Sequence, residues 1–476
     1  MSKKIIRNIC CIGAGYVGGP TMSVIAYKCK HIKVNVVDSN QSRINAWNEN
    51  NLNKLPIFEP GLEKIISETR NKNLFFSTNV EKSIANANII FISVNTPTKS
   101  KGIGAGKASD LRWVEICARQ VAKYSTGHTL VVEKSTLPVR TAEVIQKILN
   151  KSGSDSFESK YSKSFDILSN PEFLAEGNAI QDLLKPDRVL IGGENKEAIR
   201  TLSEIYENWV PKEKILLTNV WSSELAKLAA NAFLAQRISS INSISAFCEK
   251  TGADIQQVSK AIGTDTRIGD KFLNAGPGFG GSCFKKDILN LVYLSEFFGL
   301  PEVSQYWGEV IKMNEWQRRR ISELIVSKLF GTITAKRIGI LGFSFKANTN
   351  DTRDSSAIQI CKDLLNEGCN LIIYDPKVEK KQIEKDLSFD IFNRQEKFRD
   401  KAEENNLIVA KNIYDVFDSS DCVVVMTEWS HFSEINWDLA SKKMRKPGWV
   451  FDTRNIVDQK KVQKSGLNLW VVGRNY

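Results

Sequence analysis

The chain of 476 residues contains only three histidines, His31, His128 and His431, and none of them lies in a cluster with acidic residues. Histidine is the commonest metal ligand and the usual base of nucleophilic triads. A histidine-based triad or metal site is therefore not expected, and we predict that no metal is bound. Acid and base catalysis would fall to lysine, glutamate, aspartate or ordered water.

Paired cysteines and long apolar segments are also missing. The nine cysteines include no C-x-x-C motif, which argues against a zinc ribbon and for a reducing compartment. No segment approaches 18 apolar residues, and the start Met1-Ser-Lys-Lys leads into an apolar strand without a cleavage-type pattern of small residues. We therefore expect a cytoplasmic protein without a membrane partner.

A basic stripe is absent as well. The net charge of +12 comes from 66 basic and 54 acidic residues, and the basic residues are spread among the acids. This distribution favours a solvated basic surface over nucleic-acid binding, and such a surface also attracts small anionic ligands. The length predicts two or three domains.

Residues 5–38 have the pattern of a dinucleotide-binding βαβ unit. A strand over 5–12, a glycine-rich turn, a helix through Lys28 and a strand over 32–37 lead to Asp38. In this fingerprint the first glycine makes the turn, the second admits the pyrophosphate, the third allows helix packing and the acid binds the ribose hydroxyls. Asp38 favours NAD over NADP, although Arg43 could accept a 2′-phosphate. The expected contacts in the turn are Gly13, Ala14, Gly15, Tyr16, Val17 and Gly18.

Two further predicted strands, over 88–94 and 129–133, end in polar residues. Ligands of parallel sheets gather at the carboxyl ends of the strands, although the same residue types also begin helices. The candidate cofactor contacts at these ends are Val94, Asn95, Thr96, Pro97, Thr98, Ser135, Thr136 and Leu137.

Residues 222–250 read as one long helix of small and apolar residues, which could connect domains and pack against a copy of itself. Lys227 and Asn231 stand four residues apart on this helix and so share a face. Polar residues in such a stretch are either satisfied core groups or members of a site.

Cys283 lies where the glycine-rich segment 276–281 meets a predicted helix start. The unpaired N–H groups of a first helical turn and the two lysines that follow should lower the pKa of the thiol and make the sulfur a nucleophile. The alternative is a small buried thiol at a helix start.

A second βαβ pattern runs from Lys336 through a helix over 357–366 to a strand over 371–375, without the full glycine fingerprint. It should therefore hold a different nucleotide. We predict an α/β protein with two Rossmann-like doubly wound parallel-sheet domains joined by a long central helix and a helical middle domain. The predicted domains are 1–217 for NAD, 218–332 for the helical middle and 333–476 for the second nucleotide.

These motifs together resemble the nucleotide-sugar dehydrogenases, and within that family the branch that oxidises UDP-glucose. The resemblance covers nearly the whole chain and rests on residues 13–18, 95–98, 134–139, 170–177, 224–242, 278–287, 345–346 and 351–353. It implies two NAD-dependent oxidations of the sugar C6 alcohol to a uronic acid, through a bound aldehyde and a cysteine thioester. It also implies that residues 333–476 bind the UDP-sugar, and that residues 218–332 form the interface of a homodimer or a hexamer.

Residue roles follow from the same resemblance. Cys283 would attack the aldehyde, Lys227 and Asn231 would stabilise the oxyanion, Lys227 and Glu172 would move protons, and Thr136 with Asp287 would hold a water. Glu176 and Arg353 would lie near the cofactor. The implied substrate contacts are Glu172, Phe173, Leu174, Ala175, Glu176, Lys227, Asn231, Arg267, Phe272, Asn274, Gly278, Phe279, Gly280, Phe345, Lys346 and Arg454, with Arg267 often supplied by a neighbouring subunit.

Two positions depart from the family pattern. Asn274 stands where animal members have lysine, and Thr453 precedes Arg454 where glycine is usual. Two alternatives therefore stay open: a dehydrogenase of another nucleotide sugar, such as UDP-N-acetylhexosamine or GDP-mannose, and a catalytically silent nucleotide-sugar sensor. The intact set of Cys283, Lys227, Asn231 and Asp287 argues against the sensor, because a sensor needs no nucleophile.

Overall fold

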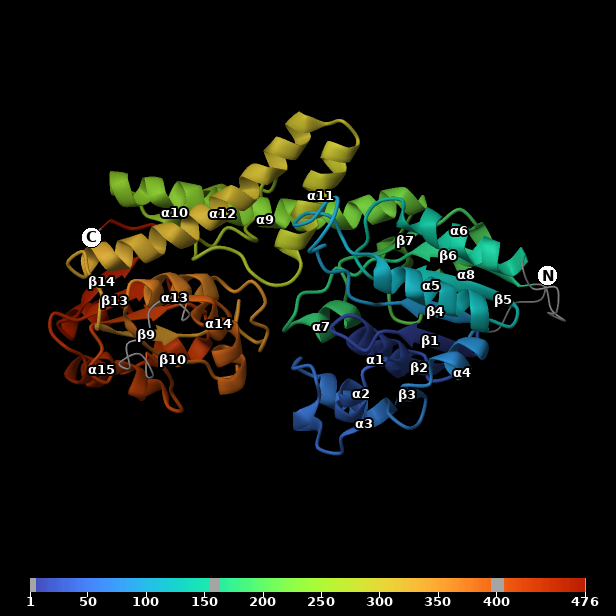
Figure 1. Ribbon diagram of the computed structural model, residues 1–476, viewed down its shortest axis with the longest axis horizontal. Helices are drawn as coiled ribbons and strands as arrows, with labels where there is room; N and C mark the ends of the chain where they lie inside the picture. Colours follow the sequence, from blue (N-terminus) through green and yellow to red (C-terminus); the bar gives the residue numbers. More distant parts are fainter. Residues whose placement is uncertain (1–5, 155–162, 395–405, 476) are drawn as a thin grey trace. The chain divides into compact units, whose positions relative to one another are not determined.

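A computed structural model describes residues 6–154, 163–394 and 406–475. The chain forms two compact units. The first contains the residues up to Ala230 together with Leu289–Ser304, and the second contains Asn231–Ile288 and Gln305–Tyr476. Each unit is built around its own β-sheet (Figure 1).

The sheet of the first unit has eight strands in the order β3-β2-β1-β4-β5-β6-β7-β8. Its strands are parallel up to β6, and β7 then pairs antiparallel with β6 through Ser169 and Gly192, while β8 runs parallel to β7. The strands are β1 (Asn8–Ile12), β2 (Lys33–Val37), β3 (Leu74–Ser77), β4 (Ile89–Ile92), β5 (His128–Glu133), β6 (Ser164–Ser169), β7 (Val189–Gly192) and β8 (Ile215–Thr218).

Helices cover both faces of this sheet because successive strand residues point to opposite sides. Ile9 and Cys11 of β1 belong to one core cluster, which includes residues of α1, α3 and α8, and Cys10 and Ile12 belong to another with residues of α4, α5 and α6. The helices of this unit are α1 (Gly18–Lys28), α2 (Gln41–Asn48), η1 (Leu52–Lys54), α3 (Leu62–Thr69), α4 (Val80–Ala85), α5 (Arg112–Tyr124), α6 (Thr141–Ser154), α7 (Ala179–Leu184), α8 (Lys196–Tyr206) and η2 (Lys212–Lys214).

The sheet of the second unit has six parallel strands in the order β11-β10-β9-β12-β13-β14. Its two faces are also covered: Ile338 and Ile340 of β9 pack with residues of α12 and α13, and Leu341 packs with residues of η3 and α15. The elements are β9 (Arg337–Leu341), α13 (Ser356–Asn366), β10 (Asn370–Tyr374), α14 (Lys380–Arg394), β11 (Leu407–Val409), η3 (Ile413–Phe417), β12 (Cys422–Val425), η4 (Ser430–Glu434), α15 (Trp437–Lys443), β13 (Trp449–Asp452), α16 (Gln459–Lys464) and β14 (Asn468–Val471).

Four helices lie between the two sheets in the sequence: α9 (Val220–Thr251), α10 (Ile255–Gly263), α11 (Phe284–Phe297) and α12 (Pro301–Lys328). The predicted helix over 222–250 corresponds to α9. The predicted fold class of two parallel-sheet domains and a helical middle is thereby confirmed, whereas the domain boundaries at 217 and 332 stay predictions.

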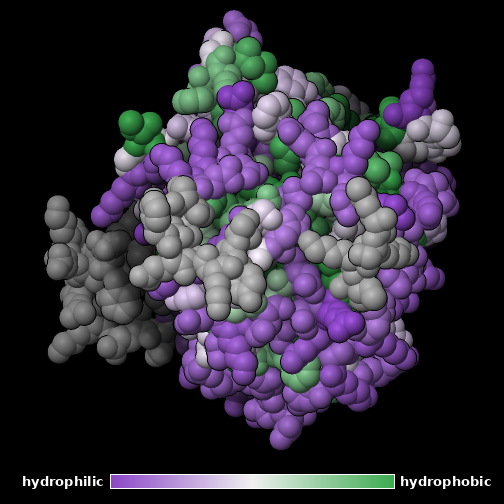
Figure 2. Space-filling view, turned by 90° about the vertical axis from the view of Figure 1, so that its right-hand side faces the viewer, coloured by the Kyte–Doolittle hydropathy of each residue, from purple (hydrophilic) through white to green (hydrophobic). Residues whose placement is uncertain are grey.

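In the described ranges, no helix combines the length and the hydropathy needed to cross a membrane. The face of the molecule in Figure 2 is hydrophilic over most of its area, and its hydrophobic side chains occur in small groups. This pattern agrees with the expected solvated surface.

Candidate active site

The glycine-rich turn after β1 has the geometry of a phosphate-binding turn. Gly13 has φ +112°, and a Cβ there would lie 2.1 Å from the Ser93 carbonyl oxygen, while a Cβ on Gly18 would lie 2.1 Å from the Gly13 oxygen. A Cβ on Gly15 would meet no atom within 4 Å. The first and third glycines are thus required by close packing, and the second faces open space that a pyrophosphate could occupy.

The start of α1 and the end of β2 complete this turn. No side chain caps α1. Gly19 N already donates to the Gly15 oxygen at 3.0 Å and Pro20 has no N–H, so a phosphate would be received by the N–H groups at the very start of the helix. Asp38 accepts a hydrogen bond from Ala14 N at 3.0 Å, and its carboxylate pairs with Arg43 at 3.0 Å. The residues present therefore fit NAD, and Arg43 is held by the carboxylate rather than free for a 2′-phosphate.

The carboxyl ends of β4 and β5 are joined by their polar residues. Ser135 Oγ donates to the Val94 oxygen at 2.7 Å, and Thr96 Oγ1 donates to the Thr136 oxygen at 3.1 Å. Leu137 is buried. The other candidates from the sequence, Tyr16, Val17, Asn95, Pro97 and Thr98, lie in the loops that follow β1 and β4.

Glu172 and Lys227 form a buried ion pair in the first unit. The Lys227 ammonium lies 3.1 Å from Glu172 Oε1, and Glu172 Oε2 accepts from Leu174 N at 2.8 Å. Lys227 Nζ also lies 5.3 Å from the centroid of the Phe173 ring. A paired, buried lysine and glutamate are suited to proton transfer because a proton can pass within the pair without a change in its net charge.

A buried glutamate that was not predicted as a site residue, Glu59, holds the segment around Glu176 in place. Glu59 accepts from Gly177 N at 2.6 Å and from Ala179 N at 3.0 Å, while Ala175 N donates to Asp182 at 2.8 Å. These bonds hold the chain on both sides of Glu176. Nothing in the local sequence around Glu59 indicates a partner more than 100 residues away.

Cys283 directly precedes α11, and it is half-buried, whereas the other eight cysteines are buried. Burial raises the pKa of the thiols of Cys10, Cys29, Cys117 and Cys369, with values of about 12, 11, 12 and 12. The Cys283 sulfur lies 3.5 Å from Ser282 Oγ. Of the nine thiols, Cys283 is therefore the one that a substrate can reach.

The two lysines after Cys283 differ from the expectation. Lys285 Nζ lies 2.9 Å from Glu315 and 3.9 Å from Asp354, and Lys286 Nζ lies 2.6 Å from Asp287. Each lysine is thus paired with a carboxylate, which offsets the positive charge that the sequence argument assigned to the surroundings of the sulfur. The helix start remains as the feature that favours a thiolate.

Asn231 and Asp287 meet in the second unit. Asn231 Nδ2 donates to Asp287 Oδ2 at 2.6 Å, and both side chains are buried. Because the Lys286 ammonium binds the other carboxylate oxygen, Asp287 is fixed from both sides.

Three polar residues on one face of α12 hold the glycine-rich loop. Asn314 accepts from Phe279 N at 2.8 Å and donates to the Phe279 oxygen at 3.1 Å, and Arg318 donates to the same oxygen at 2.6 Å. Gln317 Nε2 donates to the Gly276 oxygen at 2.8 Å. These residues were not predicted from the sequence, where their only signal is the helical spacing of polar groups.

The loop packs against the predicted nucleotide-binding residues of the second sheet. A Cβ on Gly280 would lie 3.0 Å from Phe345 Cβ, and a Cβ on Gly276 would lie 3.4 Å from Arg454 Nη1. Arg454 donates to the Phe345 oxygen at 3.2 Å, and Lys346 Nζ lies 5.7 Å from the Phe345 ring centroid. The structure thus brings Gly278, Phe279, Gly280, Phe345, Lys346 and Arg454 together within this unit.

The remaining candidates in the second unit lie around this loop or apart from it. Phe272 packs edge-on against Phe284, with ring centroids 6.4 Å apart. Arg353 pairs with Asp351, and its carbonyl oxygen accepts from Gly281 N at 2.9 Å. Asn274 is exposed, and so is Arg267, which pairs only with Asp265 among the described residues.

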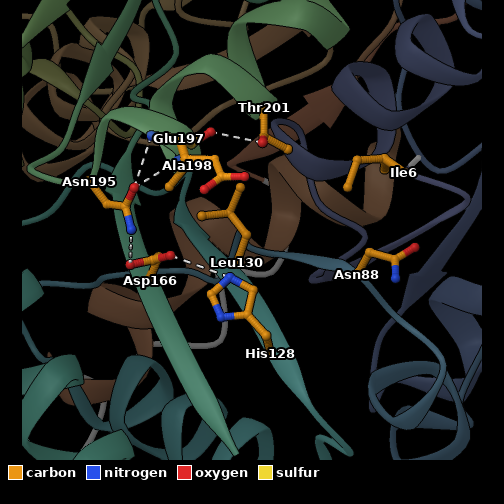
Figure 3. A pocket seen from close by; sticks show the side chains of 9 residues that line it. All are labelled: Ile6, Asn88, His128, Leu130, Asp166, Asn195, Glu197, Ala198 and Thr201. Carbon is orange, nitrogen blue, oxygen red and sulfur yellow. Dashed lines mark hydrogen bonds and ion pairs between the residues drawn. The ribbon is translucent and has the colours of Figure 1, made fainter. Parts of the chain in front are cut away.

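A cavity of about 220 Å³ lies in the first unit near the amino-terminal ends of β1, β4, β5 and β6 (Figure 3). His128 at the start of β5 lies 3.3 Å from Asp166, which accepts from Asn195 Nδ2 at 3.0 Å. The cavity contains none of the residues that the sequence predicted for the site.

A Rossmann fold with an open glycine-rich turn and an acid directly after β2 defines the first unit as that of an NAD-dependent oxidoreductase. The chain belongs to the UDP-glucose/GDP-mannose dehydrogenase family. Residues 7–210 match the NAD binding domain of this family, residues 221–316 its central domain and residues 339–459 its UDP binding domain. NAD is accordingly the cofactor.

Relatives from animals and plants match along the full length. The UDP-glucose 6-dehydrogenase of Mus musculus is 53% identical over 475 residues, covering 98% of this chain and 94% of that protein. UDP-glucose 6-dehydrogenase 4 of Arabidopsis thaliana is 52% identical, with 98% and 97% covered. The structure of a UDP-glucose dehydrogenase from Pyrobaculum islandicum has a TM-score of 0.82 at 27% identity and covers both chains completely.

Proposed function

We propose that this chain oxidises UDP-glucose to UDP-glucuronate with two equivalents of NAD, through a covalent intermediate on Cys283. The observation that carries the proposal is the position of this thiol. It is the least buried of the nine cysteines, it directly precedes α11, and its loop is fixed by α12 against Phe345 and Arg454. The names of the full-length relatives from animals and plants support the choice of UDP-glucose.

NAD, when bound, accepts the hydride in each of the two oxidations. In the first, Lys227 passes its ammonium proton to Glu172 within the pair and then takes the proton of the C6 hydroxyl, while the hydride leaves C6 and the alcohol becomes an aldehyde. The Cys283 thiolate then adds to the aldehyde carbon, and the oxygen receives a proton to give a thiohemiacetal. Asn231 stabilises the oxyanion.

The second oxidation removes the hydride from the thiohemiacetal carbon and its proton from oxygen, which leaves a thioester. Water held by Thr136 and Asp287 attacks the thioester carbon, the C–S bond breaks, and the uronate and the thiol are released. The uridine diphosphate would lie against Phe345 and Lys346, with Arg454 near its phosphates, while Glu176 and Arg353 would face the cofactor.

Counting NADH tests this function. We expect two NADH per UDP-glucose and no free aldehyde in a panel of UDP- and GDP-sugars. One NADH per sugar, or turnover of a different sugar alone, would contradict the proposal and favour the alternative substrates. No NADH with any of them would favour the silent sensor.

Replacing the nucleophile tests its role. A serine hydroxyl is far less ionised than a thiol at neutral pH, so Cys283→Ser should lower the rate of uronate formation by at least about 100-fold and leave nucleotide binding intact. Cys117→Ala, which removes a buried thiol, is the matched control and should keep the stoichiometry of two NADH. Normal uronate production by Cys283→Ser would assign Cys283 a structural role.

We further propose the domain limits 1–217, 218–332 and 333–476, a cytoplasmic location and a homodimer or hexamer. The nine free cysteines support the location, because a reducing compartment keeps thiols free. Exposed aromatic residues on the second unit, Phe233 and Phe247 of α9 and Tyr306 of α12, support an interface between copies. Arg267 would complete the sugar site of the neighbouring copy.

A further inference from the structure

Trp47 of α2 is a fully buried residue that was not predicted as a site residue, yet it binds the glycine-rich turn after β1. Its indole N–H donates to the carbonyl oxygen of Ala14 at 2.9 Å. Phe76 of β3 stacks on the indole, with ring centroids 4.6 Å apart and ring planes 4° from parallel. The Trp47 carbonyl oxygen also accepts from Arg70 at 2.8 Å, so both the ring and the backbone of Trp47 have fixed positions relative to the turn.

The bond from Trp47 to Ala14 sets the direction of the next N–H group along the chain. The peptide between Ala14 and Gly15 is trans, so its C=O and its N–H point in opposite directions. Because the oxygen points to the indole, the Gly15 N–H points away from it, and this N–H has no acceptor among the described residues. A Cβ on Gly15 would also meet no atom within 4 Å. The Gly15 N–H is therefore available to a phosphate oxygen.

A second contact joins the same ring to the start of α1. A Cβ on Gly19 would lie 2.2 Å from Trp47 Cζ2, and the three atoms nearest to that Cβ all belong to Trp47. Gly19 follows Gly18, the last glycine of the dinucleotide-binding fingerprint, and the fingerprint itself does not require a glycine at this next position. The indole therefore accounts for Gly19, and it contacts both the turn and the helix that follows the turn.

α2 also acts on the N–H group of Ala14. Arg43 and Trp47 are four residues apart on α2 and so share a face of the helix. Arg43 pairs with Asp38 Oδ2 at 3.0 Å, and the same oxygen accepts from Ala14 N at 3.0 Å. One face of α2 thus holds the N–H of Ala14 through Asp38 and the C=O of Ala14 through Trp47.

We propose that Trp47 is a positioning residue for NAD, which holds the Ala14–Gly15 peptide in the orientation that directs the Gly15 N–H toward the pyrophosphate. Because Trp47 is completely buried, it acts through the turn and does not itself touch the cofactor. The inference concerns cofactor binding and is independent of which sugar the protein oxidises.

Binding of NADH, followed by its fluorescence, tests this role without turnover. Trp47→Phe removes the indole N–H and keeps an aromatic ring against Phe76. The buried Ala14 carbonyl then lacks its donor, so the peptide is free to rotate, and the Kd for NADH should rise about tenfold. The Kd for ADP-ribose, measured by displacement of NADH, should rise by the same factor. The Kd for adenosine, which has no phosphate, should change by less than about twofold.

Trp209→Phe is the matched control, because the Trp209 indole N–H also donates to a carbonyl oxygen of the first unit, that of Leu183, at 2.9 Å. This variant should leave the Kd for NADH within about twofold of the parent. One cooperative thermal transition shows that a variant is folded. If Trp47→Phe does not fold, 3-benzothienylalanine at position 47 keeps the shape of the indole and replaces the N–H with sulfur. An unchanged Kd for NADH in the folded variant, or an equal loss of adenosine binding, would overturn the inference.

A double substitution tests whether the ring and the start of α1 act together. Gly19→Ala places a methyl group against Cζ2 and Cη2 of the indole, so it should displace the ring and raise the Kd for NADH about tenfold. Phenylalanine lacks both of these atoms. In the Trp47→Phe background, Gly19→Ala should therefore change the Kd by less than about threefold. Equal effects of Gly19→Ala in the two backgrounds would show that Gly19 acts independently of the indole and would contradict the proposal.

Discussion

A pair of buried carboxyl groups makes the first unit sensitive to pH. Glu133 at the end of β5 and Glu224 in the first turns of α9 are both buried, and their carboxyl groups interact. Glu224 accepts from the N–H groups of Arg140 and Ala142, at 2.7 and 3.0 Å, and so binds the start of α6. Burial, followed by the charge of Glu224, raises the pKa of Glu133 well above its ordinary value. Glu133 is therefore the partner that carries the proton.

The sign of the pH dependence follows from this proton. The folded state holds it at pH values where the unfolded chain, with an ordinary pKa of 4.5, has lost it. The contribution of Glu133 to the free energy of unfolding is thus fully present below pH 4.5. It is lost as the pH rises toward the folded-state pKa, at about 1.4 kcal/mol per pH unit. If Glu133 stays protonated to pH 7, the loss from pH 4.5 amounts to about 3 kcal/mol by the same relation.

Glu133→Gln should remove this dependence of the unfolding free energy on pH, because an amide does not titrate and can still donate to Glu224. We expect thermal unfolding midpoints of parent and variant to be similar near pH 5 and to diverge as the pH rises, with the variant more stable by about 2–4 °C per kcal/mol. Glu224→Gln is the matched control; it weakens the acceptor for α6 and should destabilise the unit at every pH. A difference between Glu133→Gln and the parent that is constant from pH 5 to pH 8 would refute the reasoning.

Three further outcomes are expected. Asp38→Ala should narrow the ratio of kcat/KM for NAD over NADP, because it removes a carboxylate and frees Arg43 for a 2′-phosphate; a parent that uses both cofactors equally would contradict this. Gly280→Ala places a Cβ 2.5 Å from the Asp354 oxygen and should cost about 1–3 kcal/mol of stability and most of the activity, whereas Gly308→Ala, with no atom within 4 Å, should be neutral or stabilising. Light scattering should give at least twice the chain mass of 53.5 kDa, and a fully active monomer would contradict the interface.

The elements with a local signal could be predicted from the sequence. The glycine motif followed by Asp38, the long apolar α9 and the start of α11 after Cys283 each reflect preferences that act within a few residues. Predicted and observed bounds of α9 differ by two residues at its start and one at its end, 222–250 against Val220–Thr251. The fold class followed from the order of such segments.

Features that depend on distant partners could not be predicted in the same way. The reversal between β6 and β7 leaves no local trace, because a short apolar strand reads alike in both directions. The pairing of Lys285 with Glu315 joins residues 30 positions apart, and the bond from Arg318 to Phe279 spans 39. Each of these side chains alone is an ordinary polar residue of a helix, and only the folded chain identifies its partner.

An aspartate follows β2 in the first sheet and another follows β10 in the second sheet, but their carboxylates have different partners. This difference explains why NAD belongs to the first unit. Asp375 directly follows β10 as Asp38 directly follows β2, but its carboxylate accepts from the N–H groups of Phe343, Ser344, Lys377 and Val378 at 2.7–3.1 Å. In addition, Ser344 occupies the place of the open Gly15, and its own hydroxyl bonds to Asp375. A carboxylate so fully engaged has no oxygen left for ribose hydroxyls. We therefore propose that the second Rossmann fold binds its nucleotide by other groups, namely Phe345, Lys346 and Arg454, which lie beside the glycine-rich loop before Cys283.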